Sequence, residues 1–171
     1  SEFGEELLVL DGGACEVGIE STIVDCTRGV PVLLRPGAIT RDDIAHACGQ
    51  RPLSKEELTA DTPRASGTLL AHYAPNAKVR LMDARQLQSA LDILGRDGRN
   101  IAIYHRSPLH VTTAQLLLRR MSDEPRDVAR ELFGMLRNFD DWGAKLIWIE
   151  TPPDTADWEG VRDRLQRAAA A

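Results

Sequence analysis

Paired cysteines, long apolar runs and a targeting segment are missing from this sequence of 171 residues. Cys15, Cys26 and Cys48 form no C-x-x-C pair and leave an odd count. This argues against a disulfide framework or a zinc site, and it favours reduced thiols in a cytoplasm-like compartment. No apolar run is long enough to span a bilayer, and the first residues do not resemble a signal peptide. We therefore expect a cytoplasmic protein with no membrane partner.

An excess of positive charge is also missing. The formal net charge is −5, which predicts no large basic surface for a nucleic-acid backbone. Hydrophobic residues make up 43% of the chain and charged residues 27%, which is typical of a soluble globular protein and not of a disordered one.

Several well-known site motifs are absent from the sequence. There is no G-x-G-x-x-G after a strand, no G-x-x-x-x-G-K-[ST] phosphate loop, no G-x-S-x-G elbow and no H-E-x-x-H. His46, His105 and His110 are dispersed and do not have the spacing of metal ligands. The patterns described next therefore predict a fold more directly than they predict an activity.

Residues 1–49 predict three strands and one helix. The strands are expected in "ELLVLDGG", in "ESTIVDC", which alternates with a period of two, and in the apolar run "VPVLLRPG". Thr40 is a good N-cap for a following helix, and Gly49 is a typical residue to close it.

Residues 50–78 have the composition of a linker. They contain three prolines, many small polar residues and little periodicity. The segment nevertheless includes His72 and Tyr73 in the tetrapeptide "HYAP", two large ring side chains that a passive spacer does not need.

Residues 79–171 alternate between strand and helix patterns, which predicts an open α/β sheet with mostly parallel strands. A domain boundary is placed in the preceding linker. Strands are expected in "VRLM", "NIAIYH", the later part of "TTAQLLLRRM" and "AKLIWIETPP". Helices are expected in "ARQLQSALDILGRDG", "PRDVARELFGMLRNFDDWG" and "DWEGVRDRLQRAAAA".

Three residues near the strand ends are candidates for ligand binding. The hydroxyls of Ser21 and Thr22 can donate to and accept from a carboxylate, phosphate or carbamate, although a polar strand end without a ligand is the more common explanation of such a pair. Arg35 ends an apolar strand, so its guanidinium would be held rigidly and could bind a phosphate or carboxylate with two hydrogen bonds. The alternative for Arg35 is a structural ion pair with Glu20 or Asp25.

His72 and Tyr73 also allow two interpretations. Tyr73 could stack on a base or close over a pocket, and His72 could donate to a phosphate. Alternatively, both side chains pin the linker to the surface of a domain.

The motifs taken together resemble one family. D-G-G, G-I-E-S-T-I-V-D, L-R-P-G and H-Y-A-P occur in this order, and the sequence is similar to the Sua5 family of L-threonylcarbamoyladenylate synthases over nearly its whole length. The resemblance implies that residues 1–49 are the C-terminal part of a YrdC-like catalytic domain and that residues 50–78 are the interdomain linker. It implies that residues 79–171 are the Rossmann-like Sua5 C-terminal domain.

The resemblance also implies an activity. Members of the family are nucleotidyltransferases that join L-threonine, bicarbonate and ATP into threonylcarbamoyl-AMP and release pyrophosphate. The product serves the downstream machinery that makes t6A at position 37 of tRNA. By this resemblance Ser21 and Thr22 bind the threonine or carbamoyl end, and Arg35 binds ATP. His72 and Tyr73 then belong to a lid. ATP, with Mg²⁺, is a substrate, and no tightly bound cofactor is expected.

The chain also departs from the family pattern. The family's K-x-R-P-x-x-x-P-type and S-A-N-x-S-G-type motifs do not occur, so the chain is expected to be a C-terminal fragment that is inactive alone. Residues 66–71 lack the proline, methionine and basic residue that usually precede H-Y-A-P, so lid contacts there are expected to differ. The alternative function is that of an RNA-binding or partner-binding module of the t6A pathway, or a translation factor, with at most weak RNA binding.

Overall fold

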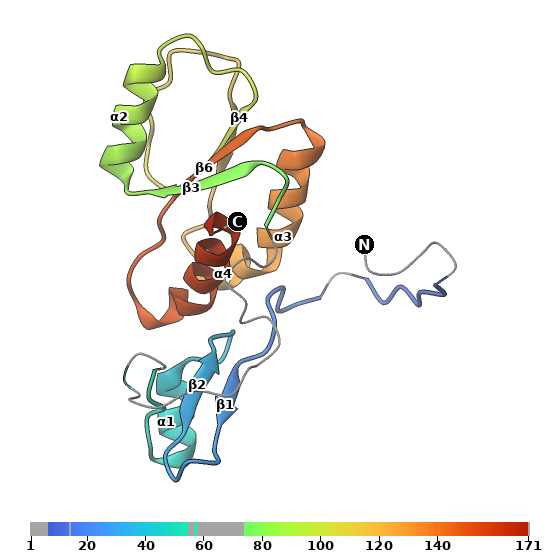
Figure 1. The fold of residues 1–171 in the computed structure, drawn as a ribbon, viewed down its shortest axis with the longest axis vertical. Coiled ribbons are helices and arrows are strands. Elements are labelled where there is room, and N and C mark those ends of the chain that lie inside the picture. Colours follow the sequence, from blue (N-terminus) through green and yellow to red (C-terminus); the bar gives the residue numbers. More distant parts are fainter. Residues whose placement is uncertain (1–6, 14, 55–56, 58–73, 171) are drawn as a thin grey trace.

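The computed structural model describes residues 7–13, 15–54, 57 and 74–170. Figure 1 shows a hairpin and one helix at one end of the molecule and a larger α/β unit at the other. The helices α3 and α4 of the larger unit lie on the side nearer to the hairpin.

The hairpin consists of β1 (Ile23–Asp25) and β2 (Val32–Arg35), which pair antiparallel with Val24 opposite Leu33. Asp25 closes the turn, because its carboxylate accepts hydrogen bonds from the Thr27 amide, the Thr27 hydroxyl and the Arg28 guanidinium. All four residues of β2 are buried. These two strands confirm two of the three predicted in this region.

The helix α1 (Arg41–Cys48) begins and ends as its sequence predicts. The Thr40 side chain accepts from the Asp43 amide, and the Asp43 carboxylate accepts from the Thr40 amide, which is a complete capping box. Gly49 ends the helix with φ of 76°, a left-handed conformation that glycine adopts without the steric cost of a side chain.

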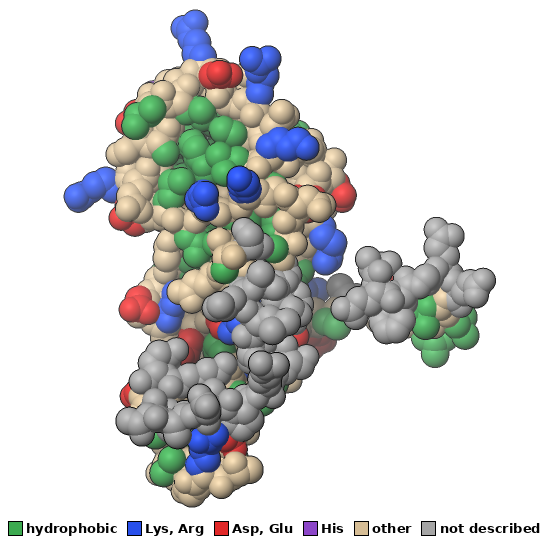
Figure 2. All heavy atoms as spheres, in the orientation of Figure 1, with side chains coloured by type: hydrophobic (Ala, Val, Ile, Leu, Met, Phe, Trp, Pro, Cys, Tyr) green, Lys and Arg blue, Asp and Glu red, His purple; other side chains and the backbone are tan. Residues whose placement is uncertain are grey.

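The strand predicted over residues 6–13 is wrong for its described part. Residues 7–10 form no strand, and their side chains, Leu7, Leu8, Val9 and Leu10, are 54% to 91% exposed. Figure 2 shows these hydrophobic side chains on a segment that projects from the body of the molecule. A strand requires a partner for its backbone groups, and none of the described segments pairs with this one.

The larger unit contains a parallel sheet of four strands in the order β3-β6-β4-β5. This confirms the predicted α/β fold and the mostly parallel sheet. The strands are β3 (Lys78–Met82), β4 (Ile101–His105), β5 (Leu117–Arg120) and β6 (Leu146–Glu150).

Helices cover both faces of this sheet. On one face α2 (Ala84–Leu94) buries Leu87 and Leu91 against Ile101, Ile103 and Trp148. On the other face lie α3 (Pro125–Asp141), the short 3₁₀ helix η1 (Ala156–Trp158) and α4 (Glu159–Ala169). Their shared core includes Leu132, Phe139, Leu165, Tyr104 and Ile149.

Among the described residues, no helix is both long and apolar enough to cross a membrane.

Candidate functional site

The hairpin brings Ser21 and Arg35 together. In the strand register Arg35 lies opposite Ile23, and Ile23 follows Ser21 by two residues. Its Nε donates to the Ser21 carbonyl oxygen at 3.1 Å, and its Nη2 lies 3.4 Å from the Ser21 hydroxyl oxygen. A hydroxyl and a guanidinium therefore lie side by side at the open end of the hairpin.

The two side chains differ in exposure. Arg35 is only 6% exposed, whereas Ser21 is exposed to solvent. Burial among the apolar residues of β2 fixes the guanidinium, and the exposed hydroxyl marks the direction from which a ligand could approach. A fixed guanidinium beside a hydroxyl can bind the oxygens of a phosphate, carboxylate or carbamate.

The carboxylates considered as ion partners of Arg35 each have another arginine. Asp25 pairs with Arg28 at 2.9 Å, and Glu20 pairs with Arg164 at 2.7 Å. Hydrogen bonds from the Thr27 side chain and amide, together with the contact to Arg28, lower the pKa of Asp25 below its ordinary value. Asp25 therefore stays ionised near neutral pH as part of the turn.

The Thr22 hydroxyl makes a different contact from the Ser21 hydroxyl. Its hydroxyl donates to the Ile39 carbonyl oxygen at 2.8 Å, which ties β1 to the loop after β2. That loop approaches closely at Gly37, where an added Cβ would lie 2.4 Å from the Thr22 backbone nitrogen. Only glycine allows this approach, so the L-R-P-G motif keeps the two strand ends together.

His72 and Tyr73 lie outside the described residues. The segment that follows Ala74 is anchored on α3. The carboxylate of Asp140 accepts from the backbone amides of Asn76 and Ala77, at 2.8 and 3.0 Å, and from the Asn76 side chain. The end of the H-Y-A-P segment is therefore fixed to the larger unit.

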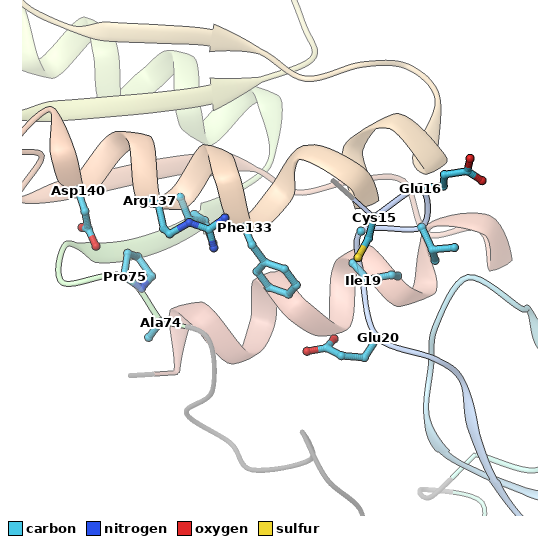
Figure 3. Close-up of a pocket in the computed structure, with 12 residues that line it drawn as sticks. Cys15, Glu16, Ile19, Glu20, Ala74, Pro75, Phe133, Arg137 and Asp140 are labelled. Carbon is cyan, nitrogen blue, oxygen red and sulfur yellow. The ribbon is translucent and has the colours of Figure 1, made fainter. Parts of the chain in front are cut away.

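A cleft of about 880 Å³ lies between residues 15–20 and α3. Phe133, Arg137 and Asp140 of α3 line one side, and the other side includes Ile19 and Glu20 (Figure 3). Ala74 and Pro75 also line the cleft. The cleft includes neither Ser21 nor Arg35, although its wall at Glu20 leads directly to Ser21.

Sequence reasoning did not identify Arg164 and Asp140, the two charged residues that hold these segments. Arg164 lies in α4 between Val161 and Leu165, both of which are buried. A charged residue on the apolar face of an amphipathic helix is the signal that could have identified it. Asp140, near the end of α3, carries no comparable signal.

The described residues contain no group of three or more His, Cys, Asp or Glu side chains placed to hold a metal ion. All three cysteines are free and exposed.

The fold and the site define an α/β protein with a four-stranded parallel sheet and a docked hairpin that presents a buried arginine beside a serine. Residues 39–170 match the family model described as "Threonylcarbamoyl-AMP synthase, C-terminal domain", and the chain belongs to this family.

Curated relatives named threonylcarbamoyl-AMP synthase match almost the whole chain. The protein from Pyrococcus abyssi is 27% identical over 98% of this chain and 50% of its own length. The protein from Bacillus subtilis is 31% identical over 94% of this chain and 48% of its own length. The chain thus spans about half the length of these relatives.

Two solved structures of P. abyssi Sua5 are similar to this fold. The complex with L-threonine has a TM-score of 0.74 and 26% identity, and it matches 93% of this chain and 48% of its own. A variant with a neighbouring histidine and tyrosine both changed to alanine has a TM-score of 0.75 and the same identity. It matches 93% of this chain and 47% of its own.

Proposed function

We propose that this chain is the C-terminal half of a threonylcarbamoyl-AMP synthase that serves tRNA t6A modification. In this proposal residues 1–49 complete a YrdC-like catalytic domain, residues 50–78 are the linker, and residues 79–171 form the C-terminal domain. The observation that carries the proposal is the Ser21–Arg35 pair, in a chain whose similar structures include a Sua5 protein complexed with L-threonine.

The chemistry of the reaction suits this pair. The amine of L-threonine and bicarbonate give a carbamate and water. A carbamate oxygen then attacks the α-phosphorus of ATP, and the bond to pyrophosphate breaks. Arg35 would bind the nucleotide phosphates through charge-assisted hydrogen bonds, and Ser21 would bind the threonine or carbamoyl group. Thr22, whose hydroxyl is bonded to Ile39, would help to shape the site.

The linker would act as the lid of this site. His72 and Tyr73 would cover the bound ligand and keep water from the mixed anhydride, which hydrolyses easily. One similar Sua5 structure is a variant in which a neighbouring histidine and tyrosine are both replaced by alanine, which is the same pair of residue types as His72 and Tyr73. Mg²⁺ would enter the site with ATP, and none of the residues named here is assigned as a metal ligand.

The test is pyrophosphate release by the full-length protein that contains this chain, with L-threonine, bicarbonate and ATP. We expect release to depend on all three substrates. Loss of charge-assisted hydrogen bonds worth about 1.5–3 kcal/mol predicts that Arg35→Met raises the KM for ATP about 10- to 100-fold. Ser21→Ala should raise the KM for L-threonine more than that for ATP.

The matched control is Arg51→Met. Arg51 pairs with Asp42 at 3.1 Å on the surface, and both side chains are more than half exposed. An exposed ion pair contributes little, so this variant should keep both KM values. Pyrophosphate release that does not require L-threonine would contradict the proposal.

A further inference from the structure

Arg164 of α4 is a fully buried charged residue whose contacts join the larger unit to the hairpin. Its side chain has 0% relative exposure. We propose that Arg164 is a positioning residue that holds Ser21 and Arg35 in the geometry needed for ligand binding. This inference rests on the proposed function, because it concerns the same site.

The guanidinium of Arg164 binds both chain segments that lead to the site. Its Nε donates to the Glu20 carboxylate at 2.7 Å, and its Nη2 donates to the Glu20 carbonyl oxygen at 3.3 Å. Its Nη1 donates to the Pro36 carbonyl oxygen at 2.8 Å. Glu20 directly precedes Ser21, and Pro36 directly follows Arg35.

Because these contacts lie next to Ser21 and Arg35, Arg164 fixes the separation of the two strand ends that carry them. Arg35 ties the two strand ends together through the Ser21 carbonyl oxygen, and Arg164 ties them together one residue further out. A ligand bound by both Ser21 and Arg35 needs their separation to be fixed in advance. Misplacement of such groups by about 1 Å can cost about 100-fold in rate.

Arg164 is itself held in place by its own helix. Asp163 accepts from Arg164 Nη1 at 2.8 Å and from Arg167 Nη2 at 2.7 Å. With a carboxylate on each side and two backbone carbonyls, the buried charge is compensated, which a buried ion requires.

Close packing of the backbones fixes the same contact. At Gly160 of α4, an added Cβ would lie 2.8 Å from both the Gly37 carbonyl oxygen and Ile19 Cδ1. The loop after Arg35 therefore rests directly on α4. A partly buried ion pair between Arg41 and Glu159, at 3.3 Å, also links α1 to α4.

The matched control for Arg164 is Arg162 on the same helix. Its side chain is 17% exposed and pairs with Asp154 at 3.0 Å. It also donates to the Pro153 and Thr155 carbonyl oxygens, which belong to the larger unit. Arg162→Met therefore removes a well-packed arginine and its carbonyl contacts from α4 and leaves the hydrogen bonds of Arg164 to Glu20 and Pro36 in place.

The experiment uses the full-length protein and its variants Arg164→Met, Arg164→Lys, Glu20→Gln and Arg162→Met. Two properties are measured: amide hydrogen exchange in residues 19–37, and KM and kcat for L-threonine and ATP. We expect Arg164→Met to speed exchange in this segment and to raise both KM values about tenfold or more. Arg164→Lys keeps the charge but loses the forked geometry, so it should recover only part of the affinity.

Glu20→Gln should change KM in the same direction by a smaller factor, because the backbone contacts of Arg164 remain. Arg162→Met should leave KM and exchange in residues 19–37 unchanged, even if it lowers stability. The inference is overturned if Arg164→Met leaves exchange in this segment unchanged, or if Arg162→Met raises KM equally. Failure of the proposed function would instead appear in the wild type, as pyrophosphate release that does not require L-threonine.

Discussion

At the scale of single residues, Glu150 shows how the larger unit occupies the carboxyl end of its own parallel sheet. Glu150 ends β6 and is buried, and its carboxylate accepts from the amides of Arg106 and Ser107 at 2.8 Å and from the Ser107 hydroxyl at 2.6 Å. In open α/β sheets, ligands commonly bind at the carboxyl ends of neighbouring strands. Here the protein's own carboxylate accepts from the amides of the loop that follows β4, which favours a supporting role for this unit.

The ionisation of Glu150 gives a prediction about pH. Burial alone would raise its pKa, but hydrogen bonds from Ser107 and the Arg106 amide outweigh burial and lower the pKa below the ordinary 4.5. A lowered pKa in the folded state means that the contribution to stability is complete above the ordinary value. It is lost as the pH falls through the folded-state pKa.

We therefore expect Glu150→Gln to lower the free energy of unfolding at pH 7 by about 1–3 kcal/mol, since hydrogen bonds to a charged acceptor are lost. The variant should also lose less stability than the wild type between pH 5 and pH 3. Urea unfolding at several pH values measures both effects. Asp97→Asn is the control, because Asp97 is 81% exposed in its pair with Arg99 and should change little. A variant with an unchanged acid slope would show that the Glu150 carboxylate does not titrate as inferred.

At the scale of elements, local patterns predict the helices and strands because their causes are local. The capping box of Thr40 and Asp43 and the apolar stripe of α3 follow from neighbouring residues. The strand expected at residues 6–13 is not formed over 7–10, because a strand depends on a partner elsewhere in the chain. The contacts of Arg164 were missed for the same reason, since Glu20 lies 144 positions away.

The contact between α4 and the loop after β2 gives a prediction for Gly160, and Gly134 of α3 is its control. Gly160→Ala would favour helix formation, but its Cβ would meet the Gly37 carbonyl oxygen at 2.8 Å, and a backbone atom cannot move aside cheaply. We expect this variant to be destabilised. Gly134→Ala in α3 meets nothing within 4 Å and should be stabilised by about 0.5–1 kcal/mol.

Chemical unfolding of the two glycine variants measures this difference, and hydrogen exchange in residues 19–37 locates it. Exchange should increase in Gly160→Ala only. Equal stabilisation of both variants would show that α4 and the loop at Gly37 are not in the close contact described.

At the scale of the whole molecule, the proposed site would need residues beyond those of this chain. Ser21 and Arg35 supply one hydroxyl and one guanidinium, whereas a triphosphate and an amino acid need several fixed donors. The chain spans about half the length of its curated relatives, and the proposed YrdC-like domain would supply the remaining donors. Local sequence patterns placed Ser21 and Arg35 near the ends of two adjacent strands, whereas their proposed ligand roles came from the family resemblance.

The prediction for the whole molecule is that ligand binding requires both halves. Calorimetric titration with ATP in the presence of L-threonine should show binding by the full-length protein and none by the present chain. With a net charge of −5, the chain should also show no strong binding of tRNA at physiological salt.

Either result of this titration assigns a role to the larger unit. Binding by the full-length protein alone would support a divided site to which Ser21 and Arg35 contribute, with the larger unit in a supporting role. Binding of ATP by the chain itself would contradict this division. The larger unit, despite the carboxylate of Glu150 at its sheet edge, would then contribute nucleotide contacts of its own.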